Sequence, residues 1–290
     1  MISAAISWDK LLESPDVQHL IDLSFKEDIG DGDITTESCF PQGKIVEAQI
    51  RARTETVACG LPLAQLLFKR LDESVEFLAV AQEGQLIASG DCLLHLKGDV
   101  RSLLTAERCA LNFLMRLCGI ATAARNASQA IPEDCHAKIY DTRKTTPGWR
   151  RLEKAAVATG GSYNHRFGLF DAVLIKDNHI AAAGSIKNAI EQCRTQAPAG
   201  MTVQVEIDNL DQLEEALAAM PDIILLDNFS THHLQEAVKR TQKQCLLEAS
   251  GGVTLDTIAA IAKSGVDRIS MGALTHTVIP ADLGLDMPPN

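Results

Sequence analysis

The chain has 290 residues, a formal net charge of −11 at pH 7, and 46% hydrophobic against 22% charged residues. This balance is typical of a globular chain rather than a disordered one, and its acidity argues against a nucleic-acid partner. The eight cysteines are scattered without a CxxC pair, which favours free thiols in a reducing compartment over disulfides or zinc.

Insertion into a membrane is not expected from the sequence. Residues 1–10 lack the apolar core of a signal peptide. The most apolar later segment, 110–124, contains Asn112 and Arg116 and is too short to span a bilayer. We therefore expect a cytoplasmic protein without a membrane partner.

The first third of the chain is predicted to form an α+β layer with mainly antiparallel strands. Ser14 and Pro15 are typical of a helix start, and a polar turn at 27–36 follows that helix. Hydrophobic patterns predict a helix at 61–71 and strands at 44–53, 57–60, 75–81 and 92–97. A long helix is then expected to begin at Thr105 and to reach about Ala130.

From residue 137 onward, strands and helices are predicted to alternate. Strands are expected at 137–140, 172–175, 202–207, 222–226, 244–248 and 266–270, and helices at 148–159, 184–196, 210–219, 231–241 and 255–264. Alternation of this kind calls for parallel strands joined by right-handed crossovers. The sheet could be open and doubly wound, but we favour a barrel, because polar residues end nearly every strand rather than one pair of strands.

The segment 141–179 is the most basic part of the chain. It carries seven Lys or Arg against four Asp or Glu, whereas the rest of the chain carries twenty against thirty-four. Local positive charge in an acidic protein indicates an anion site. Arg143, Lys144 and Lys176 follow apolar strands, where ligands of α/β proteins bind. We interpret the other helix cations as a solvated face; these are Arg150, Arg151 and Lys154.

Two carboxylates and several glycines follow the later strands. Glu206 and Asp227 suit a magnesium ion that has few protein ligands and takes others from phosphate groups. Ser250, Gly251 and Gly252 precede a helix, and Gly272 follows the last strand. Glycines at such positions let backbone N–H groups approach a phosphate. Together these features predict a phosphorylated, metal-complexed substrate beside a second anionic one.

The motifs that carry these residues resemble those of the quinolinate phosphoribosyltransferase family. They are EDIGDGDITT at 27–36, TAER at 105–108, DTRKT at 141–145, NHR at 164–166, LIKDNH at 174–179, VEID at 205–208, LLDN at 225–228, EASGG at 248–252 and ISMGALT at 269–275. The resemblance covers nearly the whole chain. Departures at 149–151 and 162–163 fall on an expected helix surface and a loop, away from the charged positions.

The resemblance implies both a fold and a reaction. The fold is an N-terminal α/β sandwich domain at 1–108, joined by 277–290, followed by an open α/β barrel of parallel strands at 109–276. The reaction converts quinolinate and phosphoribosyl pyrophosphate (PRPP), with Mg²⁺, to nicotinate mononucleotide, pyrophosphate and carbon dioxide. The assembly is a homodimer, or a higher oligomer, in which each active site borrows residues from the partner.

The resemblance also implies residue roles. The quinolinate carboxylates would be bound by Arg143, His165, Arg166, Lys176 and by Arg108 of the partner subunit, and arginine suits a planar carboxylate. PRPP would contact Lys144, Glu206 and Asp227, of which the two carboxylates also serve Mg²⁺, directly or through water. Its 5′-phosphate would lie against Ser250, Gly251, Gly252 and Gly272. The expected catalytic residues are Lys144, Lys176, Glu206 and Asp227.

Two other readings of the same residues stay open at this point. Lys176 at the end of a buried strand also suits the Schiff-base lysine of a barrel aldolase. A relative with the same fold and PRPP site could instead use an acceptor other than quinolinate. The cluster of cations suited to a dicarboxylate argues against both.

Overall fold

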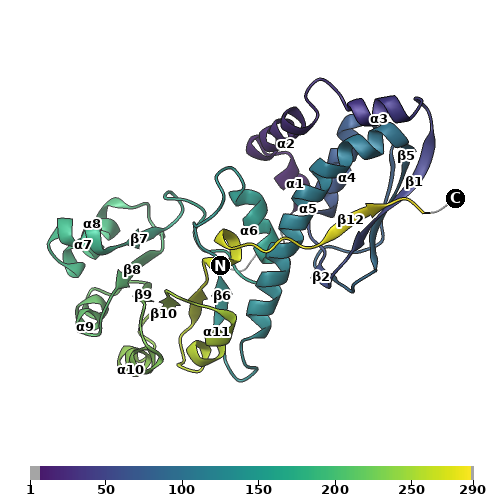
Figure 1. Ribbon diagram of the computed structural model, residues 1–290. Coiled ribbons are helices and arrows are strands. Elements are labelled where there is room, and N and C mark those ends of the chain that lie inside the picture. The colour runs from purple at the N-terminus through teal and green to yellow at the C-terminus, as the bar shows by residue number, and fades with distance from the viewer. Residues whose placement is uncertain (1–6, 289–290) are drawn as a thin grey trace. The chain divides into compact units, whose positions relative to one another are not determined.

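The computed structural model describes residues 7–288, which form two compact units. The first unit contains 7–125, 145–161 and 277–288, and the second contains 126–144 and 162–276. The boundary expected after residue 108 falls inside a continuous helix, α5 (Val100–Gln129), which passes from the first unit into the second after Arg125 (Figure 1).

Helix α5 begins at Val100, so the expected start at Thr105 is wrong. Strand β5 (Cys92–Asp99) runs directly into it, and the Asp99 carboxylate accepts the Arg101 backbone N–H at 2.8 Å. That contact is an N-cap, which satisfies one of the unpaired donors of the first turn. Arg108 therefore lies about two turns inside the helix rather than in its first turn.

A four-stranded antiparallel sheet is the centre of the first unit. Its strand order is β12-β1-β5-β3, with β12 at Leu283–Asp286, β1 at Ile45–Ala52 and β3 at Glu76–Ala79. On β1, Ala48, Ile50 and Ala52 are buried and alternate with more exposed residues, as expected for a sheet with one covered face. Residues at the C-terminal end of the described chain thus complete a sheet begun near residue 45.

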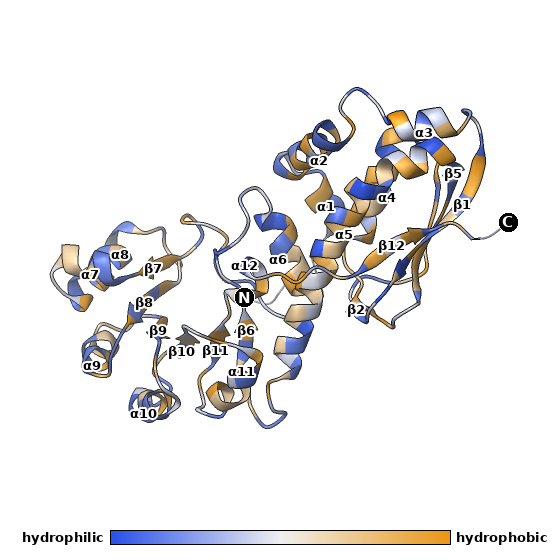
Figure 2. Cartoon of the chain, viewed as in Figure 1, coloured by the Kyte–Doolittle hydropathy of each residue, from blue (hydrophilic) through white to orange (hydrophobic). Residues whose placement is uncertain are grey.

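The remaining elements of the first unit are helices and one small strand pair. The predicted helix at 61–71 is confirmed as α4 (Leu61–Leu71). The others are α1 (Trp8–Leu12), α2 (Pro15–Asp28), α3 (Ile34–Cys39), α6 (Arg150–Thr159) and the paired strands β2 (Thr56–Val57) and β4 (Leu86–Ile87). Figure 2 shows hydrophobic residues along much of α5. These include Leu103, Leu111, Leu114 and Leu117, which are fully or almost fully buried.

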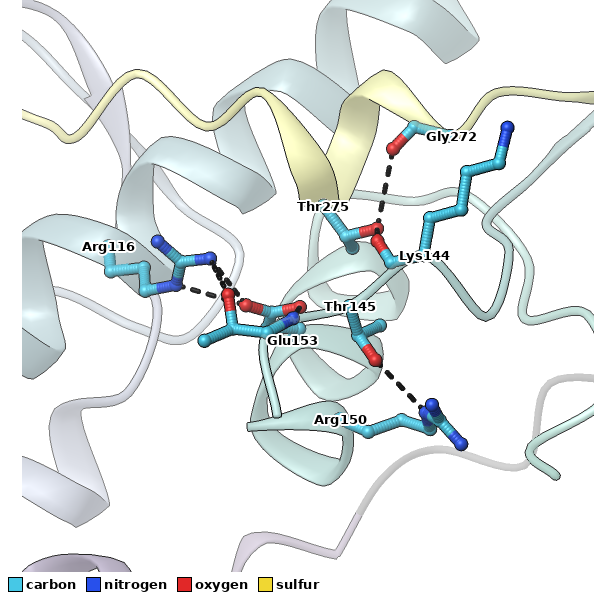
Figure 3. Close-up of polar contacts among 8 residues, drawn as sticks. Arg116, Lys144, Thr145, Arg150, Glu153, Gly272 and Thr275 are labelled. Atoms are coloured by element: carbon cyan, nitrogen blue, oxygen red, sulfur yellow. Dashed lines mark hydrogen bonds and ion pairs between the residues drawn. The ribbon is translucent and has the colours of Figure 1, made fainter. Parts of the chain in front are cut away.

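An ion pair between a partly exposed arginine and a fully buried glutamate joins α5 to α6 within the first unit (Figure 3). Arg116 donates to Glu153 Oε1 from Nε at 3.0 Å and from Nη2 at 2.6 Å. Glu153 is fully buried, and its second oxygen accepts the Thr146 backbone N–H at 3.2 Å. Lys154 is also buried, so its assignment to a solvated helix face is wrong.

The second unit contains a six-stranded, wholly parallel sheet in the order β6-β11-β10-β9-β8-β7. The strands are β6 (Lys138–Tyr140), β7 (Val173–Ile175), β8 (Val203–Ile207), β9 (Ile223–Asp227), β10 (Leu246–Ser250) and β11 (Arg268–Ser270). From β7 to β11 the order follows the chain without the reversal of a doubly wound sheet, and β6 comes next. This is the order of a barrel opened between β6 and β7.

The free edge of β6 is covered by the loop after α6. The Asp141 backbone N–H donates to the Tyr163 carbonyl at 3.0 Å, and the Tyr163 N–H donates to the Ile139 carbonyl at 2.8 Å. Tyr163 forms a parallel bridge with Tyr140. The bridge satisfies backbone groups that an open sheet edge would leave unpaired.

Helices lie along the outer side of this sheet (Figure 1). They are α7 (Asp177–Ala183), α8 (Ile186–Gln196), α9 (Asp211–Ala218), α10 (Thr231–Thr241) and α11 (Leu255–Ala262), and the short α12 (Ala273–His276) follows the end of β11. Sequence reading missed α7 and began α8 at 184. Gly184, at φ 87°, ends α7, and the Ser185 hydroxyl caps α8 by accepting the Asn188 N–H. Among residues 7–288, no helix is long and apolar enough to cross a bilayer.

Candidate active site

A cavity of about 310 Å³ opens at the carboxyl ends of the parallel strands. Three strands each contribute two lining residues that are two positions apart. These pairs are Leu174 and Lys176 at the end of β7, Leu225 and Asp227 on β9, and Glu248 and Ser250 on β10. Successive inward positions of a strand are two residues apart, so each strand presents one residue deep in the cavity and one at its rim. The other lining residues are Thr142, Arg143, Lys144, His165, Arg166, Glu206 and Ser270.

Arg143 and Arg166 both line the cavity and bring two positive charges to it. Burial lowers the pKa of Arg166, and the positive charge of Arg143 lowers it further. A hydrogen bond orients the Arg166 guanidinium, because its Nη1 donates to the Ala172 carbonyl at 3.2 Å. Two partly buried arginines this close to each other favour an anion between them.

Lys176 and Glu206 form an ion pair at the ends of neighbouring strands. Lys176 Nζ lies 2.6 Å from Glu206 Oε2, and the Glu206 side chain is 15% exposed. The sequence assigned these residues to different substrates. The structure brings them into direct contact.

Asp227 and the glycine turn after β10 are held together by short contacts. The Asn228 backbone N–H donates to the Ser250 carbonyl at 2.9 Å, and Asn228 Nδ2 donates to Asp227 Oδ2 at 2.7 Å. A Cβ on Gly251 would lie 2.1 Å from Asn228 Oδ1, so only glycine fits there. Ser250 lines the cavity, whereas Gly251 and Gly252 are outside its lining and lead toward α11.

Lys144 is exposed, and its backbone is held by the segment after β11 (Figure 3). The Thr275 hydroxyl donates to the Lys144 carbonyl at 2.7 Å. A Cβ on Gly272 would lie 3.1 Å from Lys144 Cδ. Gly272 therefore leaves the room that the aliphatic part of the Lys144 side chain occupies.

Asp141, which sequence reading did not assign to the site, organises the loop that carries His165. It is fully buried. Its two oxygens accept the His165 backbone N–H at 2.7 Å and Asn164 Nδ2 at 2.8 Å. Its signal in the sequence is an acidic residue directly after an apolar strand in an otherwise basic segment.

Glu248 is the second residue that sequence reading missed. It is fully buried, and it accepts from Gln204 Nε2 at 3.1 Å and from the Ser270 hydroxyl. Burial would raise its pKa, but hydrogen bonds, from His165 first and also from Ser270, together with the positive charge of Arg268, hold that pKa below its ordinary value. A charged residue inside the apolar run 246–249 was the available signal.

Of the expected site residues, Arg108, Gly251, Gly252 and Gly272 do not line this cavity. Arg108 belongs to the first unit, is exposed on α5, and is not among the residues that line the cavity. Among the described residues, no group of three or more His, Cys, Asp or Glu is arranged to hold a metal ion. Glu206 and Asp227 are the two expected magnesium ligands, and both line the cavity.

Comparison with known proteins identifies the family. The family description "Quinolinate phosphoribosyl transferase, N-terminal domain" matches residues 33–118, and "Quinolinate phosphoribosyl transferase, C-terminal domain" matches residues 120–286. A probable nicotinate-nucleotide pyrophosphorylase [carboxylating] of Bacillus subtilis is 42% identical over 93% of both chains. The nicotinate-nucleotide pyrophosphorylase [carboxylating] of Mycobacterium leprae is 42% identical over 88% of this chain and 91% of its own.

Solved structures agree with the sequence matches. The nicotinate-nucleotide pyrophosphorylase from Francisella tularensis superposes with a TM-score of 0.91 at 39% identity, covering 96% of this chain and 99% of its own. The enzyme of the same name from Ehrlichia chaffeensis gives a TM-score of 0.89 at 37% identity, covering 93% of this chain and 98% of its own. The chain belongs to the quinolinate phosphoribosyltransferase family.

Proposed function

We propose that this chain transfers the phosphoribosyl group of PRPP to quinolinate and releases carbon dioxide, a step in NAD biosynthesis. The observation that carries the proposal is the cavity of the second unit. Arg143, Arg166 and Lys176 line it together with the carboxylates of Glu206 and Asp227. A pyridine dicarboxylate needs the cations, and a magnesium-bound diphosphate needs the carboxylates.

The quinolinate carboxylates are assigned to the arginine side of the cavity. Arg143 and Arg166 are close enough for the charge of one to lower the pKa of the other, and a dianion between them would relieve that repulsion. Lys176 faces the same space and gains a second anionic partner when quinolinate binds. His165 lies beside this group in the cavity wall.

PRPP is assigned to the side formed by Lys144, Asp227 and Ser250. Gly251 and Gly252 lie between β10 and α11, where backbone N–H groups suit the 5′-phosphate, and Gly272 lies behind Lys144. Glu206 and Asp227 come from adjacent strands and offer the hard oxygen donors that Mg²⁺ prefers. When bound there, Mg²⁺ would stabilise the charge that develops on the departing pyrophosphate.

The reaction requires no side-chain nucleophile. The pyridine nitrogen attacks the anomeric carbon, and the bond from that carbon to the pyrophosphate oxygen breaks with its electron pair. The resulting pyridinium accepts the electron pair of the bond to the adjacent carboxylate as carbon dioxide departs, and a proton takes the vacated position. The cavity residues bind and orient the two anions and stabilise the leaving charge.

The ion pair of Lys176 argues against the aldolase alternative. Schiff-base formation needs a lysine amine that is free to attack a carbonyl, whereas Lys176 Nζ is held by Glu206 Oε2 at 2.6 Å. An alternative acceptor would have to use the same pair of arginines, and these suit a dicarboxylate best.

The oligomer and the compartment complete the proposal. We assign the active form as a homodimer in which Arg108 of the partner subunit reaches the quinolinate site. The exposed position of Arg108 on α5 leaves it available for such a role. All eight cysteines are free thiols, in keeping with a reducing cytoplasm.

One assay tests the reaction directly. Purified protein with Mg²⁺ should consume quinolinate only when PRPP is present, and should release the label of quinolinate carrying ¹⁴C in its 2-carboxylate as carbon dioxide. Nicotinate mononucleotide and pyrophosphate should form in equal amounts. PRPP-dependent product formation from another acceptor, with quinolinate inert, would reject the assignment.

A further inference from the structure

The His165 ring uses both of its nitrogens within the protein. The Arg166 backbone N–H donates to His165 Nδ1 at 2.8 Å, so that nitrogen presents a lone pair and carries no proton. The other nitrogen, Nε2, lies 3.3 Å from Glu248 Oε1. A carboxylate is an acceptor, so Nε2 must carry the ring proton. This arrangement describes a neutral imidazole of one defined tautomer.

Glu248 is bound from several elements of the second unit. Gln204 of β8 and Ser270 of β11 donate to it, and His165 reaches it from the loop after α6. Its register partner on the neighbouring strand is Arg268, whose positive charge helps to lower its pKa. Arg268 and the hydrogen-bond donors therefore stabilise the Glu248 charge beside a neutral His165.

We propose that Glu248 is a positioning residue that holds His165 as the neutral Nε2–H tautomer, and that His165 in turn fixes Arg166 in the quinolinate site. This inference rests on the proposed function for its substrate. Arg166 is anchored twice, through its backbone N–H to His165 and through its guanidinium to the Ala172 carbonyl at 3.2 Å. If Nδ1 were protonated, its N–H would face the Arg166 backbone N–H. The hydrogen bond that anchors Arg166 to His165 would then be lost.

This arrangement changes the role that the family resemblance implied for His165. It was expected to be one of the cations for the dicarboxylate. In the proposed arrangement the cations from this subunit are Arg143, Arg166 and Lys176, and His165 contributes position rather than charge. The ring is 11% exposed, which suits a support for its neighbour.

An acceptor is required at position 248 because three donors meet there. Oε1 receives His165 Nε2 and the Ser270 hydroxyl, and Oε2 receives Gln204 Nε2. Glutamine would keep one oxygen for His165 and Ser270, and Gln204 can turn its own amide oxygen toward the new NH₂ group, so Glu248→Gln can satisfy all three partners. Glu248→Leu removes the acceptor from all three and is the decisive variant.

The test begins with the free protein. With ¹⁵N-labelled histidine, long-range proton–nitrogen correlation at neutral pH should give His165 a lone-pair signal at Nδ1 and a protonated signal at Nε2. The residue is assigned by the loss of its signals in His165→Gln. Glu248→Leu should abolish this single-tautomer pattern, whereas Ser270→Ala, which removes one donor but keeps the carboxylate, should preserve it. Glu153→Gln, which alters an equally buried carboxylate of the first unit, should also preserve it.

Kinetics supply the second measurement. Glu248→Leu should raise the KM for quinolinate about tenfold or more, the effect of weakening one hydrogen bond to a charged group, and should leave the KM for PRPP nearly unchanged. A His165 protonated on both nitrogens in the unmodified protein overturns the inference, even if Glu248→Leu fails to fold. So does an unchanged tautomer in folded Glu248→Leu. If the tautomer behaves as expected while quinolinate is not consumed, the proposed function fails instead.

Discussion

Lys176 Nζ and Glu206 Oε2 lie 2.6 Å apart and form an ion pair. Lys176 is the cation assigned to quinolinate, and Glu206 is a carboxylate assigned to the Mg²⁺ that accompanies PRPP. The two residues end neighbouring parallel strands, and both line the cavity. In the proposed assignment, binding of quinolinate to Lys176 and of Mg²⁺ to Glu206 would each weaken this pair. The contact would then couple the two subsites.

The first prediction follows from that coupling. Glu206→Gln should leave quinolinate affinity intact or strengthen it, by up to about fivefold, because it removes a partly exposed competing charge. It should also impair PRPP use severely, because a magnesium ligand is lost. Calorimetric titration with quinolinate, in the absence of PRPP and Mg²⁺, measures the first effect. Asp208→Asn, which removes the same charge at an exposed position outside the cavity, is the control. Weaker quinolinate binding in Glu206→Gln alone would contradict the coupling.

The second prediction concerns acceptor choice. Nicotinate lacks the 2-carboxylate, so it should leave part of the Arg143, Arg166 and Lys176 cluster without an anion. Each lost charge-assisted hydrogen bond costs about 1.5–3 kcal/mol. The value of kcat/KM for nicotinate should then be at least about tenfold below that for quinolinate. Initial rates at equal concentrations test this, and comparable turnover of the two acids would exclude a dicarboxylate site.

The third prediction uses symmetry to test Arg108. Homodimers of Arg108→Ala and of Lys144→Ala should both be nearly inactive. In a mixed dimer, the Arg108→Ala subunit keeps Lys144 and receives an intact Arg108 from its partner, giving one complete site. Random reassembly of equal amounts should restore roughly a quarter of the original activity, because half of the dimers are mixed and each has one good site of two.

Subunit exchange must be verified for that experiment, for example with two affinity tags. Recovery near zero despite confirmed exchange would place the action of Arg108 in its own subunit or in folding. Arg101→Ala is a control on the same helix, because Arg101 Nε donates a hydrogen bond to the Phe40 carbonyl at 2.8 Å. Its loss should affect stability and should show no complementation of this kind.

The fourth prediction compares two adjacent glycines. Gly251 has φ 93° and no room for a Cβ beside Asn228, whereas Gly252 has φ 58° and open space around it. Gly251→Ala should displace Asn228 and, through it, Asp227, and should raise the KM for PRPP by more than Gly252→Ala does. Gly252→Ala should cost only about 1–2 kcal/mol, the price of a left-handed alanine. Thermal denaturation and initial rates against PRPP concentration measure both effects, and equal behaviour of the two variants would refute the close approach.

The fifth prediction concerns the ion pair of Arg116 with Glu153. Arg116→Ala leaves a fully buried carboxylate without its cation, which should reduce the free energy of unfolding by about 3–5 kcal/mol. The double variant Arg116→Met with Glu153→Leu should be markedly more stable than Arg116→Ala, because no buried charge remains. Denaturant titration of both proteins provides the comparison. A double variant as unstable as the single one would mean that the pair acts through packing rather than charge.

The sequence by itself determined the elements whose signals are local. Helices α4 and α10 occupy the predicted residues, because helical periodicity and end residues such as Ser230, which caps α10, lie within the segment that they define. The same holds for the polar residues at strand ends. Lys176, Glu206 and Asp227 line one cavity because parallel strands end at the same edge of a sheet.

Tertiary structure decided the partners of these residues. Glu248 meets Gln204 and Ser270, which lie 44 and 22 residues away in the chain, through the curvature and register of strands that local patterns do not specify. The start of α5 and the burial of Lys154 were likewise misjudged from local spacing. Helical periodicity shows which residues share a face, but the fold determines what packs against that face, and a charged residue can be buried wherever a partner from a distant segment meets it.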